Sequence, residues 1–197
     1  QQQPGLRNRG LLRRDISLGN LPLLLLPSQQ LQNLGLQTKD ATGRRDLPRA
    51  PAGPPLGVGG LPFEAVLAST KTHKLADGTD YYTINPKGYV PLLELDDGER
   101  LTEGPVIVQW IADQVPEKRL APPAGTMERY RVMEWLNFVG TELHKQFSPL
   151  FNPAMPEEAK TLSRAKLRER FAYVDERLEN RQYLMGDHFS VADAYLF

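Results

Sequence analysis

Hydrophobic and polar residues follow a regular pattern in this chain only from about residue 61 onward. Residues 61–67 partly alternate, which predicts a short strand. Residues 90–95 predict a second strand. Asp96-Asp97-Gly98 forms a turn signal, so residues 99–101 are predicted to pair back as a hairpin.

From residue 102 the pattern becomes helical. Pro105 suits the first turn of a helix, where its missing N–H costs nothing. Residues 116–125, with three prolines, are predicted to be a linker, followed by helices over residues 126–147 and 157–180. The faces predicted to be buried are Val106, Ile107, Trp110, Ile111 and Val115; then Val132, Trp135, Leu136, Val139 and Leu143; then Leu162, Leu167, Phe171, Val174 and Leu178.

Residues 1–60 differ in composition. They hold none of the chain's aromatic residues, and eight Lys/Arg against three Asp/Glu. Residues 1–59 are therefore predicted to be a low-complexity extension, either disordered or coding sequence read out of frame. A third hypothesis, an export signal at Arg13-Arg14, is disfavoured because its apolar stretch is short and interrupted by proline.

Composition excludes several classes of function. The chain has no cysteine, so it has no disulfide and no thiol nucleophile of its own. A formal net charge of zero gives no sign of nucleic-acid binding. The longest apolar run, residues 23–26, is far too short to cross a bilayer. Lack of cysteine fits a reducing compartment.

Val90-Pro91 is the first candidate site. A proline here is typical of an ordinary strand start. Alternatively, a cis bond would turn the preceding backbone outward, and the N–H and C=O of Val90 could then pair with a peptide-like ligand.

Glu103 and Gly104 form a second candidate at the start of the next helix. The helix N-terminus favours a carboxylate, and Glu103 could hold an ammonium group, so the pair suits a zwitterion. The alternative is that an acidic residue simply stabilises the helix start.

Asn137, Thr141 and His144 share one face of the 126–147 helix, and Lys145 flanks them. A solvated helix face is one explanation. The other is a site-facing role, since Asn, Thr and His are weak helix formers on a surface.

Residues 190–193 predict a capping box, in which the Ser190 oxygen accepts the amide of Asp193 and Asp193 reaches back to Ser190. The chain ends at Phe197, barely two turns later. We therefore expect the helical part to be truncated.

Seven stretches together resemble the bacterial beta-class glutathione S-transferases, in order and in spacing. They are ADGTDYY (76–82), NPKGYVP (85–91), LDDG (95–98), LTEG (101–104), EWLN (134–137), TELHK (141–145) and FSVADAYLF (189–197).

The resemblance implies an α/β plus all-α fold. Residues 60–116 would be a partial thioredoxin-like, glutathione-binding domain, and residues 124–197 a truncated helical domain. Members are cytoplasmic homodimers that conjugate glutathione, their co-substrate, to small electrophiles. It implies no metal, no nucleic acid and no membrane.

By position, the resemblance assigns Val90, before a cis-Pro91, to the cysteinyl backbone of glutathione. Glu103 and Gly104 would hold the γ-glutamyl end. The residues lining the thiol side would be Asn137, Thr141, His144 and Lys145, with His144 as the catalytic residue near the sulfur.

The chain departs from the family before residue 60. Nothing there matches the Pro-Gly-Ala-Cys-Ser stretch whose cysteine contacts glutathione. The family's first, central strand is expected to be missing, leaving Val66 and Leu92 without a neighbour and the hairpin with an open edge. Two functions follow: a glutathione transferase, or a non-catalytic protein that keeps the scaffold and binds glutathione or a partner.

Overall fold

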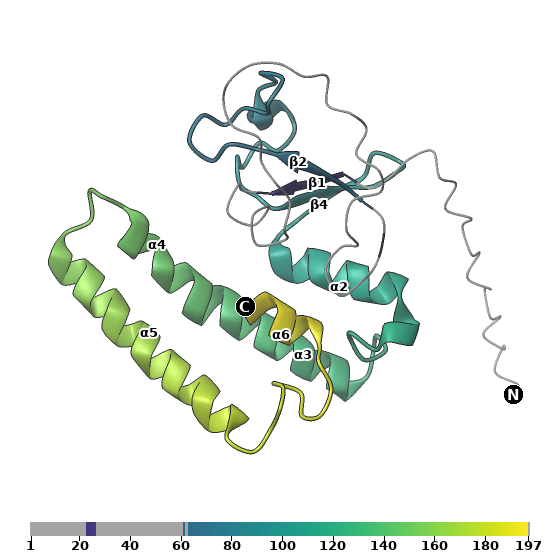
Figure 1. The fold of residues 1–197 in the computed structure, drawn as a ribbon, viewed down its shortest axis with the longest axis vertical. Coiled ribbons are helices and arrows are strands. Elements are labelled where there is room, and N and C mark those ends of the chain that lie inside the picture. The colour runs from purple at the N-terminus through teal and green to yellow at the C-terminus, as the bar shows by residue number, and fades with distance from the viewer. Residues whose placement is uncertain (1–22, 27–60, 62, 197) are drawn as a thin grey trace, which may run out of the picture.

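The computed structural model describes residues 23–26, 61 and 63–196, and it places a small sheet beside a group of helices (Figure 1). The strands are β1 (Leu23–Leu26), β2 (Glu64–Leu67), β3 (Leu92–Glu94) and β4 (Arg100–Thr102). The α-helices are α2 (Gly104–Gln114), α3 (Met127–Phe138), α4 (Lys145–Phe151), α5 (Glu157–Leu178) and α6 (Val191–Leu196). Shorter segments are the 3-10 turns η2 (Tyr81–Thr83) and η3 (Pro116–Lys118) and the π-helix η4 (Val139–His144).

The sheet has the order β2-β1-β3-β4, with β1 parallel to β2 and antiparallel to β3. Leu25 is in register with both Val66 and Leu92. The expectation that these two residues lack a neighbouring strand is therefore wrong. The reason is that a continuous apolar run suits a strand enclosed in a sheet. The rest of the extension predicted over residues 1–59 lies outside the described residues.

The predicted hairpin is confirmed, with Leu93 of β3 opposite Leu101 of β4. Successive strand residues face opposite sides of a sheet. Leu93 packs with Ile107 of α2, whereas Leu92 packs with Tyr81 of η2 on the other side. Figure 1 shows α2 between the sheet and helices α3 and α6. Helix α2 thus joins the thioredoxin-like part to the helical part.

The helical part has its core around α3, whose predicted face is buried: Val132, Trp135, Leu136, then Val139 and Leu143 of η4. The predicted face of α5 is partly wrong. Leu162 and Phe171 are exposed, while Ser163, Leu167 and Val174 are buried. Val106 of α2 is also exposed. The apolar residues at helical spacing form a wider face than the neighbouring elements bury. Among the described helices, none is long and apolar enough to span a membrane.

The helix predicted over residues 126–147 is not continuous. It begins at α3, widens into the π-helix η4 and resumes as α4, which ends at Phe151. The Thr141 hydroxyl donates to the Asn137 carbonyl at 2.9 Å, a back-bond that competes with the regular ladder. Single π-helical turns inside α-helices are frequently found at functional sites, and this one carries Thr141 and His144.

The capping box of α6 is present in altered form. The Asp193 carboxylate accepts the Ser190 N–H at 2.8 Å, as expected, and also the Ser190 hydroxyl at 2.7 Å. The Ser190 oxygen, however, accepts the amide of Ala192 rather than that of Asp193. Asp193 further accepts the Leu184 N–H at 2.8 Å, so it ties the preceding loop to α6.

Candidate functional site

The β3–β4 hairpin brings two candidate segments together. Leu92 at the start of β3 pairs with Thr102 at the end of β4. Val90-Pro91 lies just before Leu92, and Glu103-Gly104 lies just after Thr102. A pairing set by the sheet therefore places the Val90 backbone beside the start of α2.

The Val90–Pro91 peptide bond is cis, as the family resemblance implies, and β3 begins one residue later at Leu92. Within the described part of the chain, no hydrogen bond involves the N–H or C=O of Val90. These groups are free to pair with an added strand-like ligand.

Glu103 occupies an unusual backbone conformation, with φ 70° and ψ 114°, immediately before α2. Few non-glycine residues adopt positive φ, and those that do gather at binding and active sites. The Glu103 side chain makes no capping bond. Its carboxylate instead forms an ion pair at 2.8 Å with Lys87, which also donates to the Thr102 hydroxyl at 2.9 Å.

Gly104, at the start of α2, lies under the ring of Tyr195 from α6. A Cβ on Gly104 would come within 2.7 Å of that ring. The same ring stacks beside the imidazole of His144, at 6.3 Å between centroids. Burial, and then the nearby charge of Glu103, raises the pKa of the Tyr195 hydroxyl. Tyr195, which sequence reasoning gave no role, therefore connects Gly104 with His144.

The remaining candidates lie on the exposed side of the helical part. Asn137, Thr141, His144 and Lys145 are all exposed. Within residues 63–196, no hydrogen bond or ion pair joins the Asn137 amide or the Lys145 ammonium to the other candidates. The fold thus sets Val90 near Glu103 and Gly104, and Tyr195 links Gly104 with His144. No three His, Cys, Asp or Glu side chains among the described residues gather as a metal site.

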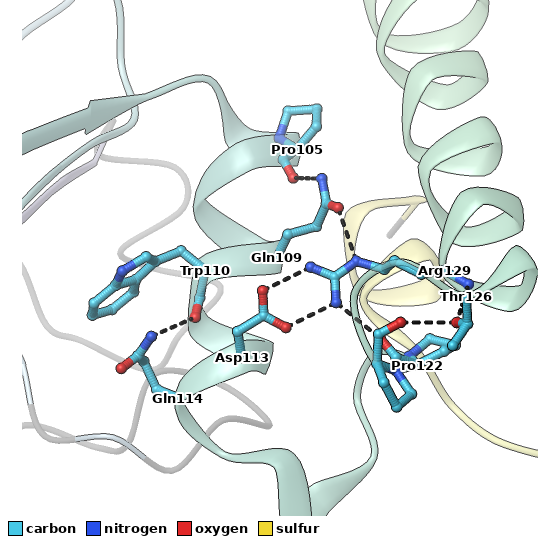
Figure 2. Close-up of polar contacts among 9 residues, drawn as sticks. Pro105, Gln109, Trp110, Asp113, Gln114, Pro122, Thr126 and Arg129 are labelled. Atoms are coloured by element: carbon cyan, nitrogen blue, oxygen red, sulfur yellow. Dashed lines mark hydrogen bonds and ion pairs between the residues drawn. The ribbon is translucent and has the colours of Figure 1, made fainter. Parts of the chain in front are cut away.

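A second feature near the site, shown in Figure 2, is a clamp between α2 and α3. The Arg129 guanidinium donates to both carboxylate oxygens of Asp113, at 2.8 and 2.7 Å. It also donates to the Gln109 side chain at 3.2 Å and to the Pro122 carbonyl at 2.9 Å. Since Arg129 is 6% exposed, the clamp holds α2, the linker and α3 in one arrangement. The Asp113 hydrogen bond raises the Arg129 pKa further.

Comparison with protein families matches both parts of the chain. The glutathione S-transferase N-terminal domain matches residues 56–114, and the glutathione S-transferase C-terminal domain matches residues 138–197. The N-terminal match contains Val90, Glu103 and Gly104, and the C-terminal match contains His144, so the candidate residues are divided between the two domains.

Relatives and solved structures agree. Glutathione S-transferase GstA of Escherichia coli O157:H7 is 47% identical over 138 residues, 70% of this chain and 69% of the relative. Glutathione S-transferase GST-4.5 of Xanthomonas campestris is 36% identical, with 70% and 69% covered. A ternary complex of BphK, a bacterial transferase, is 55% identical with a TM-score of 0.70, covering 71% and 70%. A sphingomonad transferase complexed with glutathione is 45% identical with a TM-score of 0.68, covering 71% and 69%.

The fold and the junction site define a two-domain class of protein, a thioredoxin-like sheet followed by a helical domain. The chain belongs to the glutathione S-transferase family, as predicted from its motifs.

Proposed function

We propose that this chain binds glutathione at the junction of its two domains and conjugates the glutathione thiolate to a small electrophile. The observation that carries this is the register of the hairpin. It sets the unpaired backbone of Val90 beside the α2 N-terminus at Gly104. Glutathione needs both features, because it has a peptide backbone and a zwitterionic γ-glutamyl end.

The cysteinyl residue and the γ-glutamyl end of the tripeptide each have a partner in this arrangement. The N–H and C=O of Val90 pair with the cysteinyl residue as a short added strand. The Gly104 N–H at the start of α2 donates to the γ-glutamyl carboxylate, and Glu103 holds the ammonium group. Lys87 forms an exposed ion pair with Glu103 and lies beside this position.

The chain has no cysteine, so the nucleophilic sulfur has to come from glutathione. The thiol gives its proton to solvent water. The thiolate then forms a C–S bond with the electrophilic carbon as the bond to the leaving group breaks and the leaving group departs with the electron pair. His144 is the proposed catalytic residue, donating to the sulfur as its charge develops. Asn137, Thr141 and Lys145 line the same side of the helical domain.

We also propose a homodimer in the cytoplasm. Four exposed apolar side chains follow α2 and α3: Val106, Met127, Tyr130 and Met133. Met127, Tyr130 and Met133 recur every three residues along α3, and exposed apolar patches are typical of a contact with another protein surface. Light scattering after size exclusion tests this, with a dimer expected near twice the 22.2 kDa chain mass. A monomer at micromolar concentration would contradict it.

A second candidate, a non-catalytic glutathione binder, is favoured by one observation: the chain has no cysteine where the family places one. One experiment separates the two. Glutathione binding is measured by calorimetry, and conjugation is measured with a generic aryl halide. Saturable binding with glutathione-dependent product supports the transferase. Binding without product supports the binder, and no binding contradicts both.

A further inference from the structure

Two buried side chains donate to the same backbone carbonyl next to the candidate site. The Tyr81 hydroxyl donates to the Tyr89 carbonyl at 2.8 Å, and the Asn85 side-chain amide donates to it at 2.7 Å. Tyr81 is 1% exposed and Asn85 is 4% exposed. A carbonyl oxygen has two lone pairs, so both acceptor positions of Tyr89 are occupied.

The donors are themselves held in place by the loop that precedes β3. The Tyr81 N–H donates to the His73 carbonyl at 2.8 Å, and the Asn85 N–H donates to the Tyr81 carbonyl at 2.9 Å. The Asn85 side-chain oxygen accepts the Lys87 N–H at 3.2 Å. Both groups of the Asn85 amide are thus engaged, which fixes the orientation of its side chain.

The orientation of Val90 follows from the geometry of the peptide bond. The carbonyl of Tyr89 and the N–H of Val90 belong to one planar unit, and in a trans unit they point in opposite directions. The Val90–Pro91 bond is the cis bond of this segment, so the Tyr89–Val90 unit is trans. Because Tyr81 and Asn85 draw the Tyr89 carbonyl inward, the Val90 N–H is turned away from them.

We propose that Tyr81 and Asn85 are positioning residues, which hold the Tyr89 carbonyl so that the Val90 backbone stays directed toward the ligand. The inference rests on the proposed function, since it takes glutathione as that ligand. In this proposal Tyr81 and Asn85 act through the Tyr89 carbonyl and do not touch the ligand themselves. Burial raises the pKa of Tyr81, so its hydroxyl stays a donor through neutral pH.

The test compares two Tyr-to-Phe changes in the full chain. Tyr81→Phe removes one donor and keeps the ring. Tyr82→Phe is the matched control, because its ring is 47% exposed and its hydroxyl makes no hydrogen bond in the described part of the chain. Asn85→Asp removes the other donor and keeps the oxygen that accepts from Lys87. Glutathione affinity is measured by calorimetry, together with kcat, KM and the melting temperature.

We expect Tyr81→Phe to weaken glutathione binding about three- to tenfold, the effect of one lost buried hydrogen bond. KM for glutathione should rise while kcat at saturation stays within about twofold, and Tyr82→Phe should match the wild type. Asn85→Asp should weaken binding at least as much.

Wild-type affinity in both Tyr81→Phe and Asn85→Asp would overturn the inference and leave the proposed function standing. A fall in kcat that follows the melting temperature would also overturn it, because that pattern indicates a general structural role. A wild-type chain that does not bind glutathione contradicts the proposed function instead.

Discussion

The ring of Tyr195 rests directly on Gly104, so that a Cβ at position 104 would come within 2.7 Å of the ring. Tyr195 belongs to α6, near the end of the chain, and Gly104 begins α2 in the thioredoxin-like domain. One contact therefore connects the last described helix with the proposed γ-glutamyl position. The His144 ring stacks beside the same Tyr195 ring.

Gly104→Ala should lower the free energy of unfolding by about 1–3 kcal/mol, because the added methyl overpacks a closed contact. It should also weaken glutathione binding, since the Tyr195 ring can move only by separating from His144. Urea unfolding measures the first effect and calorimetry the second. Gly140→Ala is the control. Its Cβ would meet the Tyr195 hydroxyl at an ordinary 3.8 Å, so little change is expected there. Equal effects at the two glycines would contradict the account.

Arg129→Met should destabilise the chain by about 2–4 kcal/mol. It keeps the length of the buried side chain but leaves the Asp113 carboxylate and the Pro122 carbonyl without their donor. Arg131→Met, two residues along α3, is the control. It breaks an exposed pair with Glu134, and surface pairs contribute less than about 1 kcal/mol. Denaturant unfolding measures the loss of stability in each variant. Similar losses in both would show that the clamp contributes no more than a surface pair.

The architecture was largely predictable from the sequence, because hairpins and amphipathic helices leave regular patterns. The hairpin register follows from the Asp96-Asp97-Gly98 turn, and the α3 core follows from apolar spacing. The strand β1 was missed for a physical reason. A central strand of four leucines has no alternation, and it lies in a segment of unlike composition. The π-helix η4 was also missed, since a helical period predicts an ordinary helix.

For the proposed site, the sequence indicates candidate residues but not the contacts that support them. Val90, Glu103 and His144 stand in recognisable motifs. The β3–β4 pairing sets Val90 near Glu103, and His144 stacks on Tyr195, whose ring covers Gly104. Tyr81 and Asn85 stand in those motifs too, yet nothing in the sequence shows that both donate to Tyr89. Contacts between a side chain and a distant backbone group have no period, so they become visible only in three dimensions.

Stability should fall at alkaline pH through two tyrosines. Burial raises the folded-state pKa of Tyr81 and of Tyr195 above the ordinary tyrosine value of about 10, since it disfavours the phenolate. Their contribution is therefore complete below about pH 10 and is lost as the pH rises from there through the folded pKa values. Unfolding curves measured from pH 8 upward test this. Tyr81→Phe should reduce the fall in the free energy of unfolding above pH 10. The same fall in the variant as in the wild type would contradict a contribution from Tyr81.

His144→Ala should lower kcat by about tenfold or more while leaving stability within about 0.5 kcal/mol, because the side chain is exposed and its proposed role is to donate to the sulfur. His188→Ala is the control, an exposed histidine in the loop before α6. Steady-state conjugation kinetics and a thermal melt measure the two effects. A normal kcat in His144→Ala would remove this residue from the catalytic role.

The measurement that tests the central claim most directly is glutathione titration of the 197-residue chain beside its Glu103→Gln variant. Glu103→Gln keeps the size of the side chain and removes the charge proposed to hold the glutathione ammonium group. The account predicts saturable binding by the wild type, and affinity at least tenfold weaker in the variant, with both proteins equally folded. No binding by a folded wild-type chain, or equal binding by both, would contradict a glutathione site built on Val90, Glu103 and Gly104.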